Sequence, residues 1–220
     1  MRVRVAVIDS GVHAAHPHVG GVAGGIAIDP DGREHDDYVD RLGHGTAVTA
    51  AIKEKAPDAD VFAVRIFDRQ LATRIETLVR AIDWAIRERM HIANLSLGTT
   101  KLEHRDVLLG AVERANASGL FIVSARDDEG IQWLPGSLPG VIPVQLDWEC
   151  PRDQYRVVQQ DGVVVFRASG YPRPIDGVPP SRNLNGISFA VANMTGFVAR
   201  ARERYEAATL VAALAAPVWP

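Results

Sequence analysis

Three short segments of this chain each carry a side chain that acyl-transfer chemistry uses. Asp9 lies in Val-Ile-Asp-Ser-Gly, His44 in Gly-His-Gly-Thr and Ser188 in Asn-Gly-Ile-Ser-Phe-Ala. A carboxylate that orients an imidazole, an imidazole that takes a proton and a hydroxyl that attacks a carbonyl carbon form a catalytic triad. The order Asp, His, Ser along the chain is one of the orders in which such triads occur. The sequence therefore predicts a nucleophilic serine, and this prediction requires a fold that brings the three side chains together.

The elements that must position these residues follow from the alternation of apolar runs with segments of helical period. Five apolar runs of strand length are nearly continuous, which is typical of a parallel sheet covered on both faces. Between two of these runs, apolar residues from Ile75 to Ile86 recur at helical spacing, with charged residues on the opposite face. The predicted strands are 3–8, 61–66, 92–97, 120–124 and 141–146, and the predicted helices are 44–55, 75–88, 104–118 and 188–204.

Strands that alternate with helices predict an α/β fold, a doubly wound and mostly parallel sheet with helices on both faces. Segments 155–160 and 163–168, separated by Asp161-Gly162, predict in addition a small β-hairpin with a two-residue turn. Asp9 ends the first predicted strand, and ligands of such sheets bind beyond the carboxyl ends of the strands. His44 and Ser188 each begin a predicted helix, where free N–H groups favour developing negative charge.

The composition favours one soluble domain. With 220 residues and 47% hydrophobic content the chain can bury one sizeable core, and no long polar linker divides it, so we expect a single domain over 1–220. The net charge of −3, with mixed signs, forms no basic stripe and argues against nucleic acid as a partner. The single cysteine, Cys150, excludes an intramolecular disulfide. The start of the chain lacks a secretory signal and no apolar run approaches membrane-spanning length, so we expect a cytoplasmic protein that contacts no membrane.

Around these three segments the chain resembles the subtilisin-like serine proteases, or subtilases, and the resemblance extends over most of its length. The matching segments follow one another in the order and spacing of the family, which makes accidental similarity improbable. The chain is therefore identified as similar to a compact, intracellular-type subtilase. The segments that carry this resemblance are Ala56-Pro-Asp-Ala-Asp-Val-Phe-Ala-Val64, Ile82-Asp-Trp-Ala-Ile86, Ile92-Ala-Asn-Leu-Ser-Leu-Gly98, Leu134-Pro-Gly-Ser-Leu-Pro-Gly-Val-Ile142 and Phe166-Arg-Ala-Ser-Gly170.

The resemblance implies a role for each site residue. Ser188 attacks the peptide carbonyl, His44 takes its proton and returns it to the leaving amine, and Asp9 holds the imidazole in the correct tautomer. One segment pairs as a strand with the extended substrate through main-chain hydrogen bonds, and a second borders the primary specificity pocket. The implied substrate-binding residues are Ser96, Leu97 and Gly98 in the first segment and Ala125, Arg126 and Asp127 in the second.

The chain departs from the family pattern at the residue expected to stabilise the oxyanion. Family members usually carry Ala-Gly-Asn where this chain has Arg126-Asp-Asp128, so Asp128 replaces the amide that donates to the oxyanion. Removing that donor from a subtilisin costs about 10²–10³ in rate. The main-chain N–H of Ser188 is the second expected donor, and Asp128 serves as a donor only if its pKa is raised enough to keep it protonated. Asp127, in place of Gly, narrows the pocket or favours a basic or small substrate side chain; the alternative is a surface loop that has acquired charges.

The remaining candidate residues have weaker patterns. By resemblance, Asp40 lies where it meets a basic substrate residue beside the scissile bond, whereas the default interpretation of this acidic loop is solvation. His13, His16, His18 and His35 lie close in sequence, but their spacing matches no helical metal motif. We therefore expect no essential metal and no cofactor.

These observations favour a serine endopeptidase that works through an acyl-enzyme. The atypical oxyanion segment suggests narrow specificity, such as peptide maturation. We expect an extended peptide or protein as substrate, and in addition a partner that activates the enzyme. The alternative is a degenerate subtilase that binds peptides or depends on a partner and does little catalysis. A more remote alternative, a phosphoacceptor domain that uses Asp9, leaves His44 and Ser188 without a role.

Overall fold

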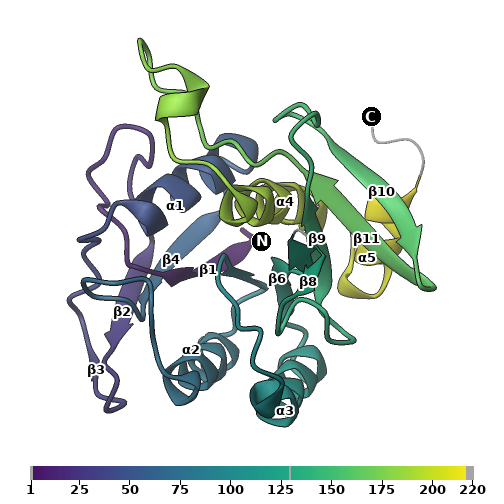
Figure 1. The fold of residues 1–220 in the computed structure, drawn as a ribbon. Helices are drawn as coiled ribbons and strands as arrows, with labels where there is room; N and C mark the ends of the chain where they lie inside the picture. Colours follow the sequence, from purple (N-terminus) through teal and green to yellow (C-terminus); the bar gives the residue numbers. More distant parts are fainter. Residues whose placement is uncertain (1, 129, 217–220) are drawn as a thin grey trace.

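In the computed structural model, nine strands of the described residues form one twisted sheet in the order β10-β11-β9-β6-β5-β1-β4-β2-β3 (Figure 1). The structure describes residues 2–128 and 130–216, and the side chains of Asp128 and Ser181 lie outside that description. The strands of this sheet are β1 (Arg4–Asp9), β2 (Gly24–Ile28), β3 (Glu34–His35), β4 (Asp60–Arg65), β5 (Ile92–Leu95), β6 (Phe121–Ala125), β9 (Ile142–Leu146), β10 (Tyr155–Gln160) and β11 (Val163–Ala168).

The centre of the sheet is parallel, as the apolar runs predict. β1 pairs in parallel with β4 on one side and with β5 on the other, and β6 continues the parallel order to β9. β1 is buried from Val5 to Asp9 because helices cover both faces of the sheet. The strand expected over 92–97 ends at Leu95, which leaves residues 96–98 free of the sheet at its carboxyl edge.

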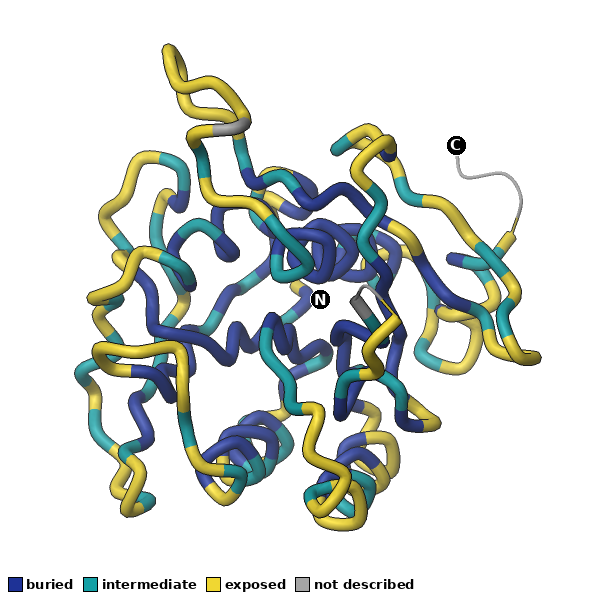
Figure 2. Tube along the Cα trace, in the orientation of Figure 1, coloured by how far each residue is buried: buried dark blue, intermediate teal, exposed yellow. Residues whose placement is uncertain are grey.

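Helices pack on both faces of the sheet, and in the described part of the chain a large hydrophobic core lies on each face, with a smaller cluster around Val12 and Val19. Figure 1 shows α1 (His44–Lys55) and α4 (Ile187–Arg202) on one face, and α2 (Ile75–Arg87) and α3 (Arg105–Ala117) on the other. α5 (Ala207–Ala215) joins the α1–α4 side through Leu210 and Leu214. α4 is buried along most of its length, whereas α2 and α3 expose their outer faces (Figure 2). The doubly wound α/β fold is thereby confirmed.

The predicted hairpin is present, but it extends the main sheet. β10 and β11 pair antiparallel across Asp161 and Gly162, whose φ angles of 53° and 76° are those of the turn that matches strand twist. β11 then pairs in parallel with β9, so the hairpin adds two strands to the edge of the sheet.

Several elements carry no apolar run, and the sequence analysis did not predict them. β2 begins with two glycines, and a Cβ on Gly25 would lie 2.5 Å from the carbonyl oxygen of Ala63, so close strand packing requires Gly there. β7 (Asp127–Asp128) and β8 (Ile131–Gln132) form a separate two-stranded hairpin, and short 3₁₀ helices cover Leu102–His104 and Pro180–Arg182. Within the described part of the chain, the helices are too short or too polar to cross a bilayer.

Candidate active site

Asp9 and His44 form a buried pair at the carboxyl edge of the sheet. Asp9 ends β1 and is fully buried, and its Oδ1 lies 2.7 Å from Nδ1 of His44. The same oxygen accepts the main-chain N–H of Ser10 at 2.7 Å. Because Nδ1 faces the carboxylate, the Nε2 atom of His44 is the nitrogen available for proton transfer.

The N-terminus of α1 fixes the imidazole because two side chains bind its first free N–H groups. Ser10 Oγ accepts the N–H of Gly45 at 2.9 Å, and Asp40 Oδ2 accepts the N–H of Thr46 at 2.9 Å. A Cβ on Gly45 would lie 2.2 Å from the carbonyl oxygen of Gly11, so only glycine fits directly after the histidine. The Gly-His-Gly-Thr motif is thus a packed and capped helix start that holds His44 beside Asp9.

Opposing effects act on the pKa of His44. Burial of the imidazole lowers this pKa, but the hydrogen bond that the imidazole donates to Asp9, the charge of Asp9 and the charge of Asp40 together outweigh burial. The net result is a pKa above the ordinary value of 6.5. Asp9 therefore stabilises the imidazolium, the state that a general base reaches after it takes a proton.

Ser188 lies at the second position of α4, where the chain turns sharply after Gly186 with φ 129°. Its Oγ donates to the carbonyl oxygen of Ser96 at 3.2 Å, and no hydrogen bond joins it to His44 among the described residues. Both side chains line the same cleft. Catalytic hydrogen bonds are often absent or long before substrate binds, and rotation about χ1 redirects a serine hydroxyl.

A buried polar chain that sequence analysis missed holds the serine segment against β5. Thr195 Oγ1 donates to Asn94 Oδ1 at 2.9 Å, Asn94 Nδ2 donates to Ser96 Oγ at 2.9 Å, and Ser96 Oγ donates to the carbonyl oxygen of Ser188 at 2.9 Å. Asn94 and Thr195 are fully buried. The available signals were an asparagine inside an apolar strand and a threonine two helical turns after Ser188 on the same face of α4.

The cleft beside Ser188 has a volume of about 400 Å³ and collects most of the expected substrate-binding residues. Ser96, Leu97, Gly98 and Ala125 line it together with His44 and Ser188. Phe67, Leu71, Ile75 and Leu78 give the cleft an apolar surface, and Trp133, which the sequence analysis did not single out, also lines it. An apolar cleft beside a nucleophile and a base is suited to an extended peptide.

Unlike Ala125, Arg126 and Asp127 do not line this cleft. The buried Arg126 forms ion pairs with Asp161 at 3.0 Å and with Asp127 at 3.5 Å. The Asp127 carboxylate accepts hydrogen bonds from Gln145 Nε2 at 3.0 and 2.9 Å. Both side chains therefore join a polar cluster that ties the segment after β6 to β9 and the hairpin.

The oxyanion hypothesis for Asp128 concerns a side chain outside the described residues. Its backbone pairs with Ile131 in the β7–β8 hairpin. The second expected donor, the main-chain N–H of Ser188, lies in the first turn of α4, where N–H groups have no intrahelical acceptor.

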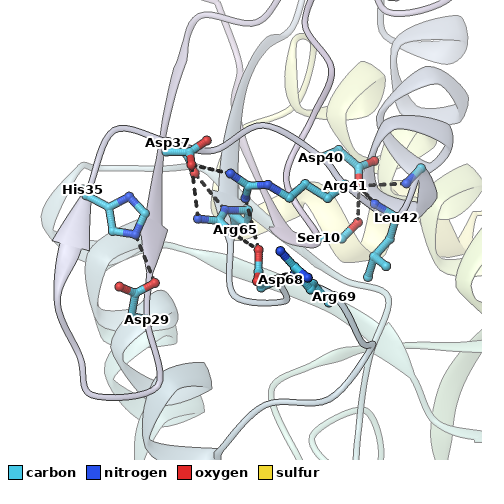
Figure 3. Close-up of polar contacts among 11 residues, drawn as sticks. Ser10, Asp29, His35, Asp37, Asp40, Arg41, Leu42, Arg65, Asp68 and Arg69 are labelled. Carbon is cyan, nitrogen blue, oxygen red and sulfur yellow. Dashed lines mark hydrogen bonds and ion pairs between the residues drawn. The ribbon is translucent and has the colours of Figure 1, made fainter.

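Asp40 directs its carboxylate to its own loop and to α1. Oδ1 accepts hydrogen bonds from Ser10 Oγ at 2.9 Å and Leu42 N at 2.9 Å (Figure 3), and from Gly43 N at 2.8 Å. Oδ2 accepts two from Thr46, from N at 2.9 Å and from Oγ1 at 2.6 Å. These bonds support a positioning role for Asp40 at the His44 segment, and the expected contact of Asp40 with a basic substrate residue stays a prediction.

Ion pairs beside Asp40 fix the rest of this loop. Arg65 donates to Asp68 at 2.9 Å, and Arg41 pairs with both Asp37 and Asp68 (Figure 3). Within residues 2–128 and 130–216, no group of three His, Cys, Asp or Glu side chains is arranged to hold a metal ion.

The sheet, the buried Asp–His pair and the serine at a helix start define the class of subtilisin-like proteins. The sequence model of the Subtilase family matches residues 2–143, and the chain belongs to that family. A thermostable alkaline protease from Halalkalibacterium halodurans is 32% identical over 94% of this chain and 58% of its own length. Subtilisin E from Bacillus subtilis is 33% identical over 58% of this chain and 35% of its own length.

The fold is also similar to that of a cold-adapted subtilisin-like serine proteinase of known crystal structure. The TM-score is 0.73 over 97% of this chain and 81% of that chain, at 21% sequence identity. This likeness concerns the fold, and the family membership rests on the sequence matches. The chain spans 58% of the length of the Halalkalibacterium protease and less of Subtilisin E.

Proposed function

We propose that this chain is a serine endopeptidase that hydrolyses peptide bonds through an acyl-enzyme on Ser188. The observation that carries the proposal is the 2.7 Å pair of His44 and the buried Asp9 on the cleft that Ser188 lines. The names of its relatives, proteases from Halalkalibacterium halodurans and Bacillus subtilis, support the same reaction.

The proposed reaction uses these side chains in two steps. Ser188 Oγ attacks the carbonyl carbon of the peptide while His44 Nε2 takes the hydroxyl proton, and the imidazolium then gives this proton to the leaving amine. Water next attacks the ester, His44 takes a proton from the water, and the returning proton regenerates Ser188. The main-chain N–H of Ser188 supports the oxyanion in both steps, and the Asp128 side chain, if protonated, is the second proposed donor.

The proposed substrate is an extended segment of a peptide or protein, and the proposed role is narrow, such as maturation of a peptide precursor. Residues 96–98 leave β5 beside the cleft, which supports pairing with an extended chain. A cytoplasmic location and an activating partner remain predictions. An intracellular serine protease from Paenibacillus polymyxa, 30% identical over 58% of this chain, supports the location.

The alternative proposal, a peptide-binding subtilase with little catalysis, draws on the contact between Ser188 Oγ and the carbonyl of Ser96. Labelling with a fluorophosphonate between about pH 5 and 8 separates the two proposals, with Ser188→Ala as control and the adduct located by mass spectrometry. Labelling at Ser188 supports the peptidase, and labelling that weakens with rising pH in the wild type but not in Asp128→Asn supports a protonated Asp128. Absence of labelling at every pH supports the binding protein.

A further inference from the structure

Trp133 lines the cleft and belongs to a segment that is bonded to both of the segments that border it. Its main-chain N–H donates to the carbonyl oxygen of Arg126 at 2.8 Å. The next residue, Leu134, exchanges two main-chain hydrogen bonds with Thr99, at 2.8 and 2.9 Å. Residues 133–134 therefore bridge the two segments that border the cleft, 97–99 on one side and 125–126 on the other.

The side chain of Trp133 lies directly against the backbone of Gly98. A Cβ on Gly98 would lie 3.3 Å from Cε3 of the indole and 2.7 Å from the carbonyl oxygen of Leu134. The indole N–H is buried and has no hydrogen-bond partner in the described part of the chain. Packing against Gly98, rather than a hydrogen bond, therefore fixes the ring.

The two walls next to the indole carry almost no side chain of their own. Gly98 contributes none and Ala125 contributes a single methyl group, while the carboxylate of Asp127 and the guanidinium of Arg126 are bound to Gln145 and Asp161. A substrate side chain that enters between these walls therefore meets no unpaired charge of Asp127 or Arg126. It meets the face or edge of the indole, held in place by the backbone bonds of residues 133 and 134.

We propose that Trp133 is a specificity-determining residue that restricts the substrate residue on the carbonyl side of the cleaved bond to small side chains, such as Gly, Ala or Ser. The inference rests on the proposed peptidase function and adds to it the class of substrate. One methylene group too many or too few in an apolar pocket changes kcat/KM by about 10–200-fold. We therefore expect a preference for Ala over Phe of about 10–200-fold in kcat/KM.

The test uses a series of otherwise identical fluorogenic peptides with Ala, Val, Leu, Phe or Lys at this position. In the wild-type chain kcat/KM falls from Ala to Phe, and in Trp133→Ala the ratio of kcat/KM for Phe to that for Ala rises about 10–200-fold. Trp133→Phe removes the indole N–H, which has no partner, and keeps an aromatic ring, so it retains the preference for Ala. Trp148→Ala is the matched control, because Trp148 is half exposed on the hairpin side of the sheet and lies outside the cleft.

Two results overturn the proposal. One is a wild-type chain that cleaves Phe and Leu peptides as well as the Ala peptide. The other is a folded Trp133→Ala, judged by circular dichroism, whose Phe-to-Ala ratio equals that of the wild type.

Failure of the proposed peptidase function gives a different result, and the role of Trp133 can then still be tested by peptide binding. If Ser188 is not labelled and no peptide is cleaved, the binding of labelled peptides that end in Ala or Phe is measured by fluorescence anisotropy. Tighter binding of the Ala peptide, lost in Trp133→Ala and kept in Trp148→Ala, supports the inference without catalysis. Equal binding of the two peptides overturns it.

Discussion

At the scale of single residues, the decisive contact is the one between His44 and the buried Asp9. Burial of the imidazole alone favours its neutral form, whereas the carboxylate at 2.7 Å favours the imidazolium. The pKa of His44 lies above its ordinary value because Asp9, together with the charge of Asp40, outweighs burial. Two predictions follow from this balance, one on pH dependence and one on rate.

The first prediction concerns pH. A general base must be neutral, so kcat/KM rises with pH as His44 loses its proton, and the midpoint lies above the ordinary pKa of 6.5. In Asp9→Asn the lowering effect of burial remains and the charge is gone, so the pKa of His44 falls. NMR titration of the imidazole protons measures both values without requiring activity. A pKa that is equal in the two proteins contradicts this interpretation.

The second prediction concerns the rate of the chemical step. Asparagine keeps the shape of Asp9 but leaves the imidazole in the wrong tautomer, and the equivalent change in a serine protease lowers kcat about 10⁴-fold. We expect a similar loss in Asp9→Asn, with KM changed far less. Steady-state kinetics on one peptide gives both constants, and Asp36→Asn, an exposed carboxylate of the next loop, is the control. A large increase in KM with unchanged kcat would point instead to a disturbed substrate cleft.

At the scale of elements, the start of α1 depends on Asp40, which accepts five hydrogen bonds from the loop and the helix. Asp40→Ala leaves the N–H of Thr46 without its acceptor and releases the loop, and we expect it to lower the free energy of unfolding by about 2–3 kcal/mol. Urea denaturation measures this loss, and Asp36→Ala, next to the same loop, is expected to stay within about 0.5 kcal/mol of wild type. A destabilised Asp40→Ala with normal kcat/KM would contradict its positioning role for His44.

Element by element, the accuracy of the sequence predictions followed the strength of the local signal. The apolar runs of β1 and β4 and the turn residues Asp161 and Gly162 determine structure through nearby residues, so the predicted strands and hairpin are present within one or two positions. β2 was missed because its glycines serve a tertiary contact with β4. Where the hairpin attaches also depends on a distant strand, and no local pattern encodes it.

Prediction of the candidate site from the sequence was limited in the same way. The segments around Asp9, His44 and Ser188 are recognisable because each is a short run of neighbouring residues that resembles the subtilase pattern. The buried chain from Thr195 through Asn94 to Ser96 joins residues about a hundred positions apart, and Trp133 reaches the cleft only through backbone bonds to Arg126 and, by way of Leu134, Thr99. Such contacts arise from the assembled sheet. An asparagine inside an apolar strand hints that a polar partner exists, but a single sequence does not say which residue that partner is.

At the scale of the whole molecule, the charge of the cleft is opposite in sign to the net charge of the chain. The chain carries a net charge of −3, yet the charged residues that line the cleft, in the described part of the chain, are the basic Arg74 and Lys101, accompanied by His44 and His104. Within the same residues, Arg74 and Lys101 form no salt bridge, while His104 lies 3.8 Å from Glu103. A cleft of one sign raises the local concentration of oppositely charged substrate, whatever the net charge of the protein.

This distribution predicts a preference for acidic residues upstream of the cleaved bond, where we expect an extended substrate to pass Arg74 and Lys101. Exposed pairs contribute about 0.2–1 kcal/mol each, so replacing Lys by Glu at the best of these positions is expected to raise kcat/KM about 2–10-fold. The gain must shrink in about 1 M salt, where the screening length falls to about 3 Å. Peptides that carry Glu, Gln or Lys at each of positions two to four upstream, assayed at low and high salt, measure both effects. Lys101→Glu should reverse the order, whereas Lys53→Glu, on the far end of α1 and outside the cleft, should not. A preference that persists unchanged in high salt would indicate shape recognition, and charge would then have no part in it.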